Sequence, residues 1–180
     1  MTEERPSKGE GGLPEADVLT KKTRISEARS LVGDAPCVVP QDMDLKEVPR
    51  QVWRRRGVRV VAVVDTEGRL VGVIPLRLLL DELFFHVAPE EFISDIRKRE
   101  RIEEIGRMVR AHTAGELMQP PLYVTLDGTV KDAFILMHDQ DVGGLPIVDD
   151  EMRPVGYLDR LQLLEVWIRE HPSQASEIQQ

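Results

Sequence analysis

The sequence predicts an α/β fold of the α+β type, built from two tandem β-α-β-β-α units with a helical insert between them. Residues 39–80 can be laid over residues 124–164 with one extra residue in the first copy. Both copies place short apolar runs and helical leucine patterns in the same order. Residues 84–113 have no counterpart elsewhere in the chain and show helical periodicity.

The repeat divides the chain into five expected segments. These are a flexible N-terminal tail (1–24), a first repeat (25–83), the helical insert (84–113), a second repeat (114–168) and a C-terminal tail (169–180). The N-terminal segment combines charged residues with Pro and Gly, and it lacks the apolar side chains needed to offset the entropy cost of ordering.

The first helix of each repeat is expected to begin at a capping residue, Asp44 in the first copy and Thr129 in the second. An acidic residue three positions later, Glu47 or Asp132, can satisfy backbone N–H groups at a helix start. Pro49 conflicts with a start at Asp44, because a proline inside a helix removes a hydrogen bond. We therefore expect the first helix to start later or to be distorted.

A buried strand, a hairpin turn, a second strand and a closing helix follow in each copy. The buried strands are expected at residues 58–64 and 142–148, where apolar side chains run up to an aspartate. The second strands are expected at 70–74 and 154–158. The closing helices are expected at 76–83 and 160–168, because their leucines are spaced to face a core.

The insert suits a helix, since Pro89, Glu90 and Glu91 favour a helix N-terminus. Its aromatic side chains, among them Phe84 and Phe85, are costly to leave in water. We expect a packed arm between the repeats; the alternative is a helix that binds a partner.

The composition excludes several function classes. Lys and Arg total 24 against 32 Asp and Glu, and the net charge of -8 disfavours non-specific attraction to nucleic acid or anionic lipid. The single cysteine, Cys37, cannot form an intrachain disulfide, and no apolar run approaches the ~18 residues that span a bilayer. We expect a cytoplasmic protein that neither binds nucleic acid nor inserts into a membrane.

The sequence contains no motif of a catalytic or metal site. A Gly-rich phosphate loop, a nucleophile elbow and a zinc signature are all missing. The histidines have no metal-site or dyad spacing; they are His86, His112, His138 and His171. We therefore expect no enzymatic activity and no metal site.

Several segments of the second copy follow one known repeat closely, namely residues 114–118, 123–127, 129–134, 142–149 and 155–158. The first copy is parallel but weaker, at residues 38–40, 45–48, 60–65 and 70–74. These segments resemble the repeat of the CBS (cystathionine-β-synthase-type) domain family, whose paired repeats form a Bateman module. The resemblance implies two repeats packed about a pseudo-twofold axis, two clefts between them, and dimerisation into a flat disc.

In family members that bind adenosine-containing ligands, a Gly-x-x-Thr/Ser-x-x-Asp motif supplies a hydroxyl near the phosphate and a carboxylate for the ribose. The first copy places Pro75 and Leu78 at these positions, and the second copy places Asp159 and Gln162 there. A carboxylate repels a phosphate, whereas a glutamine can still hydrogen-bond a hydroxyl. The resemblance implies AMP, ADP, ATP and S-adenosylmethionine as candidate ligands, and the departures leave open that neither cleft binds a nucleotide.

The cleft edges provide the candidate binding residues. Arg59 follows a basic run, residues 54–56, and its guanidinium could hold a phosphate bidentately; the run itself could simply end a helix. Gly143 and Gly144 could let the backbone approach a ligand or could form a helix-to-strand turn. The complete set of expected ligand-binding residues is Arg59, Val60, Gly143, Gly144, Pro146, Asp159, Arg160 and Gln162.

Asp159 and Arg160 also have a simpler interpretation, as a helix cap and a surface arginine. We predict that a phosphorylated adenosine ligand binds at the cleft edged by Arg59 rather than beside Asp159. The predicted protein is a homodimeric regulatory module that senses a small ligand and signals to a protein partner. The alternative is a degenerate repeat pair that serves as a dimerisation or interaction scaffold without nucleotide binding.

Overall fold

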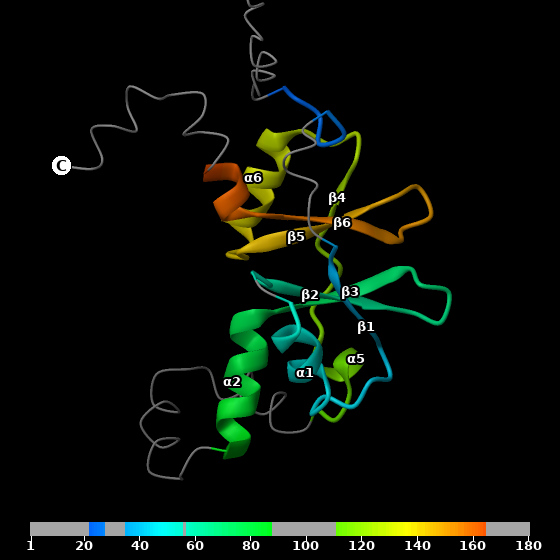
Figure 1. Ribbon diagram of the computed structural model, residues 1–180, viewed down its shortest axis with the longest axis vertical. Coiled ribbons are helices and arrows are strands. Elements are labelled where there is room, and N and C mark those ends of the chain that lie inside the picture. The colour runs from blue at the N-terminus through cyan, green and yellow to red at the C-terminus, as the bar shows by residue number, and fades with distance from the viewer. Residues whose placement is uncertain (1–21, 28–34, 56, 88–110, 165–180) are drawn as a thin grey trace, which may run out of the picture.

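The computed structural model describes residues 22–27, 35–55, 57–87 and 111–164, without the side chains of residues 84–87. These residues form two three-stranded sheets, one above the other in Figure 1, with helices beside each sheet. Nearly all of the predicted N-terminal tail, the predicted C-terminal tail and most of the predicted insert lie outside the described residues.

The first sheet is built from the first repeat. It contains β1 (Cys37–Pro40), β2 (Val60–Val64) and β3 (Leu70–Pro75) in the order β1-β2-β3. The central strand β2 pairs parallel with β1 and antiparallel with β3. The helices beside this sheet are α1 (Val48–Trp53), α2 (Leu76–Val87) and α5 (Ala114–Leu117).

The second sheet repeats this topology. It contains β4 (Val124–Thr125), β5 (Gly144–Val148) and β6 (Pro154–Asp159), with β5 parallel to β4 and antiparallel to β6. Helix α6 (Val130–Asp139) packs on β5, and residues 160–164 begin the closing helix. The predicted α/β fold with two tandem units is therefore confirmed.

The two repeats start their first helices differently. Thr129 and Asp132 form the predicted capping box at the start of α6, in which each side chain accepts a hydrogen bond from the other residue's N–H at 3.2 Å. The expected cap at Asp44 is wrong, because the Asp44 carboxylate instead accepts the Lys46 N–H at 2.9 Å in a turn. Helix α1 begins at Val48 with Pro49 in its first turn, where proline is tolerated.

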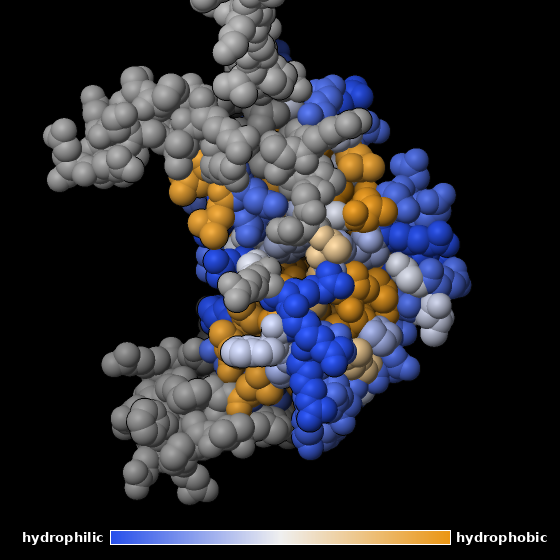
Figure 2. Space-filling model, viewed as in Figure 1, coloured by the Kyte–Doolittle hydropathy of each residue, from blue (hydrophilic) through white to orange (hydrophobic). Residues whose placement is uncertain are grey.

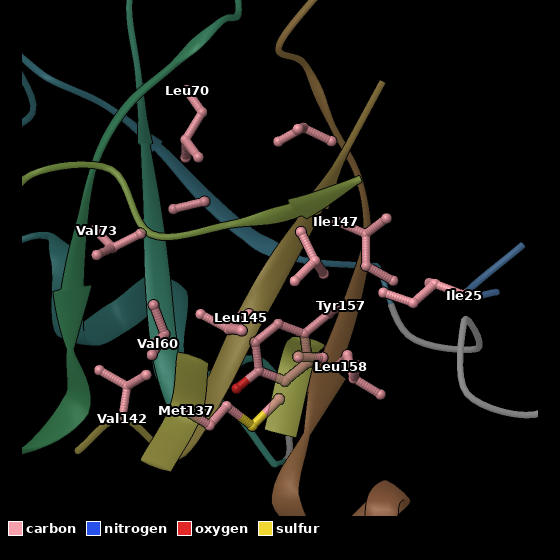
Figure 3. Close-up of a cluster of buried hydrophobic side chains, with 14 of the residues drawn as sticks. Ile25, Val60, Leu70, Val73, Met137, Val142, Leu145, Ile147, Tyr157 and Leu158 are labelled. Atoms are coloured by element: carbon pink, nitrogen blue, oxygen red, sulfur yellow. The ribbon is translucent and has the colours of Figure 1, made fainter. Parts of the chain in front are cut away.

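Both faces of the first sheet are buried, which explains why β2 is apolar at every position. Val61 and Val63 pack with residues of α1, α2 and α5, whereas Val60 and Ala62 pack toward the second sheet. Successive side chains of a strand point to opposite faces, so burial of both faces requires an unbroken apolar run. The cluster that joins the two sheets, which we call the shared core, is shown in Figure 3.

Two short segments complete the sheet of the other repeat. Ile25 is the first residue of the first repeat, yet it is 0% exposed in the shared core and its N–H donates to the Gly128 carbonyl of the second repeat at 2.9 Å. Conversely, Val73 in β3 and Gln119, just before β4, exchange backbone hydrogen bonds of 3.1 and 2.8 Å. Helix α5 also packs in the core of the first sheet. Each unit therefore includes the segment with which the other repeat begins.

Candidate functional site

A cleft opens where the start of α2 faces the end of α6. Its volume is about 400 Å³, which lies within the ~300–1,000 Å³ range of small-molecule sites. We call it the Arg59 cleft. Its polar lining consists of Arg59, Arg77, Asp81, Gln119, Gln140 and Asp141. Because the first three come from the first repeat and the other three from the second repeat, the cleft lies between the two repeats.

The charges of the Arg59 cleft are only partly paired. Arg77 and Asp81 form an ion pair along α2, with 3.2 Å between Nη1 and Oδ2. The Asp141 side chain is 92% exposed, and its Oδ1 lies 3.8 Å from Nη2 of Arg160. Across the described ranges, the Arg59 guanidinium makes neither an ion pair nor a hydrogen bond. Arg59 is therefore available to an anion in the cleft.

Arg59 belongs to the first repeat but is held by the second. Its backbone N–H donates to the hydroxyl of Tyr157 in β6 at 2.9 Å. Its side chain lies against Gly143, where an added Cβ would come within 3.1 Å of the Arg59 Cβ. The position of Arg59 therefore depends on how the two repeats pack.

The region beside Asp159 is differently arranged. Asp159, only 7% exposed, accepts the N–H of Gln162 at 2.9 Å, and the Gln162 side chain accepts the Asp159 N–H at 2.8 Å. These reciprocal bonds form a helix cap that engages both side chains. A second cavity, bordered by Val60 and Tyr157 but not by Asp159 or Gln162, measures about 20 Å³, room for roughly one water.

The structure divides the predicted ligand-binding residues into three groups. Arg59 and Gly143 line the Arg59 cleft. The buried strand positions are Val60, Gly144 and Pro146; of these, Val60 borders the small cavity and Gly144 lies beneath the Tyr157 hydroxyl. Asp159, Arg160 and Gln162 open the closing helix, where Arg160 Nη2 donates to the Met137 carbonyl at 2.7 Å.

The basic run before Arg59 does not line the described cleft. Arg54 is the C-cap of α1, and Arg55 Nη1 donates to the Ala35 carbonyl at 2.9 Å. Arg56 lies outside the described residues. The placement of Arg54 and Arg55 fits the helix-end interpretation.

Five polar residues of the cleft escaped the sequence-based prediction: Arg77, Asp81, Gln119, Gln140 and Asp141. Asp81 could have been found, because it lies one helical turn beyond Leu78, the position at which the family motif has its carboxylate. Gln119 could not, because it reaches the cleft only through its pairing with Val73 of β3.

The described part of the chain gives little support for a reactive cysteine, a metal site or a membrane-spanning helix. Burial raises the pKa of the Cys37 thiol and outweighs the lowering effect of Arg55, so the thiol stays protonated at neutral pH. No cluster of three His, Cys, Asp or Glu side chains suitable for a metal ion occurs among the described residues. None of the described helices is long and apolar enough to cross a membrane.

Comparisons with known proteins agree with this architecture. The CBS domain model matches residues 28–85 and 114–169. An uncharacterized protein of Methanocaldococcus jannaschii is 25% identical over 166 residues, which cover 83% of this chain and 98% of the relative. The crystal structure of a CBS domain-containing protein from Thermotoga maritima is 27% identical with a TM-score of 0.63, over 81% of this chain and 94% of that chain.

A further similar structure is the cytosolic domain of the Mg²⁺ channel MgtE in complex with ATP. It is 28% identical with a TM-score of 0.54, and the match covers 77% of this chain and 48% of that chain. Because the CBS domain model matches both repeats and the two sheets share the fold of solved CBS domain proteins, the chain belongs to the CBS domain family.

Proposed function

We propose that this CBS domain pair is a regulatory, non-catalytic module that binds a phosphorylated adenosine ligand in the Arg59 cleft and signals to a protein partner. The observation that carries the proposal is an open cleft of about 400 Å³ edged by an arginine whose guanidinium has no partner within the described residues. The ATP complex of the similar MgtE domain supports this ligand class.

The guanidinium of Arg59, which is unpaired within the described residues, favours this cleft over the region beside Asp159. Two carboxylates also line the cleft, but Asp81 is paired with Arg77 and Asp141 lies 3.8 Å from Arg160. A guanidinium can form two charge-assisted hydrogen bonds to a phosphate. Asp159 would instead place a negative charge near the phosphate, and its carboxylate and the Gln162 amide are already engaged in the helix cap. Leu76, Leu80 and Val142 provide apolar lining suited to a purine ring.

The signal would depend on two conformations of the repeat pair. A ligand shifts such an equilibrium only through its differential affinity for the two states. Because both repeats line the Arg59 cleft, a ligand that contacts both would favour one relative placement of the repeats.

Replacing Arg59 by alanine should weaken AMP binding about tenfold or more at low salt, because a charge-assisted phosphate contact contributes roughly 1.5–3 kcal/mol. Asp159→Ala should leave the affinity unchanged or raise it. Titration calorimetry on both variants measures these effects. Arg54→Ala is a matched control, since Arg54 is an exposed arginine that does not line the cleft. Wild-type affinity in Arg59→Ala, or loss of binding in Asp159→Ala, would refute this assignment.

The scaffold alternative rests on a specific observation: Pro75 and Leu78 line the cleft where the family's ligand-binding motif has a hydroxyl and a carboxylate. A thermal-shift screen with AMP, ADP, ATP, S-adenosylmethionine and Mg²⁺ separates the two functions. A ligand at ~100 times its Kd adds about 2.7 kcal/mol to stability. If none of these compounds raises the Tm, the scaffold is the better account.

We also propose a homodimer that buries apolar side chains of the outer helices. The exposed apolar residues on α2, α6 and the closing helix are Leu80, Phe134, Ile135, Leu161 and Leu164. Apolar surface is visible over the closing helix and near α2 in Figure 2, and large exposed apolar patches commonly mark interfaces. Light scattering should give twice the 20.4 kDa mass of one chain.

Leu161→Glu should shift this dimer toward the monomer, because it places a charge on the proposed contact surface. Val155→Glu is the control, since Val155 is also an exposed apolar residue (47% against 58% for Leu161) but lies on β6 rather than on these helices. A monomeric mass for the parent protein, or equal effects of the two variants, would exclude this dimer surface.

A further inference from the structure

The hydrogen bond between Tyr157 and Arg59 joins residues 98 positions apart. The Tyr157 hydroxyl accepts the Arg59 N–H at 2.9 Å, and its ring lies in the shared core, where it is 6% exposed (Figure 3). Burial raises the pKa of Tyr157 to about 12, although the N–H groups of Arg59 and Val60 act to lower it. The hydroxyl therefore stays neutral at physiological pH and provides a fixed acceptor.

Two glycines make this arrangement possible. A Cβ at Gly144 would collide with the Tyr157 hydroxyl, so only glycine lets the ring reach across β5. A Cβ at Gly143 would lie 3.1 Å from the Arg59 Cβ and 3.3 Å from its Cγ, so the arginine stem packs directly on the backbone there. The second repeat thus contacts both the backbone N–H and the side-chain stem of Arg59, while the Arg59 carbonyl accepts the Leu76 N–H within the first repeat at 2.8 Å.

The second repeat holds Arg59 of the first repeat through Tyr157, but among the described residues the first repeat has no corresponding contact to the second. In the sheet registers, Gly144 pairs with Asp159 and Val60 pairs with Pro75, which makes Val60 the counterpart of Gly144 and Val73 the counterpart of Tyr157. Val73 has no hydroxyl with which to accept a hydrogen bond. The Cβ of Val60 would also block a tyrosine at position 73, as a Cβ at Gly144 would block Tyr157. The first repeat therefore cannot hold Gly143, the counterpart of Arg59, in the same way.

We propose that Tyr157 is a positioning residue that sets the specificity of the Arg59 cleft for phosphorylated ligands. By fixing the Arg59 backbone, it sets the point on the cleft edge from which the arginine side chain extends, so that less backbone freedom is lost when the guanidinium binds a phosphate. This inference rests on the proposed function, because it assumes that the Arg59 cleft binds an adenosine phosphate.

Calorimetry with AMP and with adenosine tests the inference. Tyr157→Phe keeps the ring in the core but removes the acceptor, and it should weaken AMP binding about fivefold at low salt, because the less constrained Arg59 must then be ordered when the phosphate binds. Its affinity for adenosine should stay unchanged. Combined with Arg59→Ala, it should cause no further loss of AMP affinity, because the two residues act through one contact.

Two further variants separate positioning from a general structural effect. Gly144→Ala, which displaces the hydroxyl without removing it, should also lower AMP affinity more than adenosine affinity. Tyr123→Phe is the matched control, since Tyr123 is a half-buried tyrosine at the edge of the shared core and lines neither cavity. It should bind both ligands like the parent, and retained adenosine binding shows that a variant is folded.

The possible outcomes are distinct. Three results would overturn the positioning role while the proposed function stands, provided that the parent protein binds AMP. Tyr157→Phe could bind AMP as well as the parent does, or it could lose AMP and adenosine affinity equally. Its loss of AMP affinity could also add to the loss caused by Arg59→Ala. If the parent binds neither ligand, the proposed function fails and the inference fails with it.

Discussion

Replacing Ile25, the first residue of the first repeat, by alanine should lower the free energy of unfolding by about 2–5 kcal/mol. Its side chain is 0% exposed in the shared core, and truncation would leave a cavity there. The neighbouring backbone would keep its hydrogen bonds to the second repeat, from Ile25 to Gly128 and from Ser26 to Leu126, both of 2.9 Å. The expected loss is therefore mainly one of packing.

Denaturant unfolding measures this loss, and native-state hydrogen exchange shows where it falls. The amides of β5 and β6 should lose more protection than those of β1 and β2, because Ile25 completes the second unit. Ser26→Ala is the control, since Ser26 is exposed and its backbone bond does not need the side chain. Loss of protection confined to β1 and β2 would contradict the packing of Ile25 with the sheet of the second repeat.

Gly72→Ala should destabilise the protein by about 3 kcal/mol. A Cβ on this buried residue of β3 would meet the Met118 sulfur and lie 2.7 Å from the Gln119 carbonyl oxygen. Overpacking costs roughly 1–3 kcal/mol, and moving Gln119 weakens its two backbone bonds to Val73, each contributing about 1 kcal/mol. The same shift should disturb the Arg59 cleft, because Gln119 lines it.

Thermal and denaturant unfolding of Gly72→Ala should be compared with Val71→Ala. Val71 is a half-buried neighbour on the same strand, and truncating it should cost about 1 kcal/mol without moving the Gln119 carbonyl. If the two variants lose the same free energy of unfolding, the close approach of Met118 and Gln119 to β3 does not exclude a side chain at position 72.

The sequence by itself determined those helices and strands that depend only on residues close to one another along the chain. The apolar run of β2 and the capping box of Thr129 and Asp132 depend on neighbouring residues, and both lie where expected. The late start of α1 followed from Pro49 for the same reason. The likeness between the two copies then predicted two similar units, because similar local patterns fold to similar elements.

Parts of the candidate site could be predicted in the same way. Arg59 and Gly143 were found because each directly precedes a buried strand, and both line the cleft. Asp159 is the helix cap that its simpler interpretation in the sequence predicted, and the Asp159 and Gln162 side chains each accept the backbone N–H of the other, a use that the family motif did not suggest.

Only the tertiary structure decided which residues share the Arg59 cleft and what holds them. Ile25 and Gln119 each complete the sheet of the other repeat, and Tyr157 reaches the Arg59 amide from 98 residues away. Such contacts form only when the two sheets pack face to face and bury their common apolar surface. The sequence pattern indicates which side chains can be buried, whereas the packing of the two repeats determines which residues each buried side chain contacts.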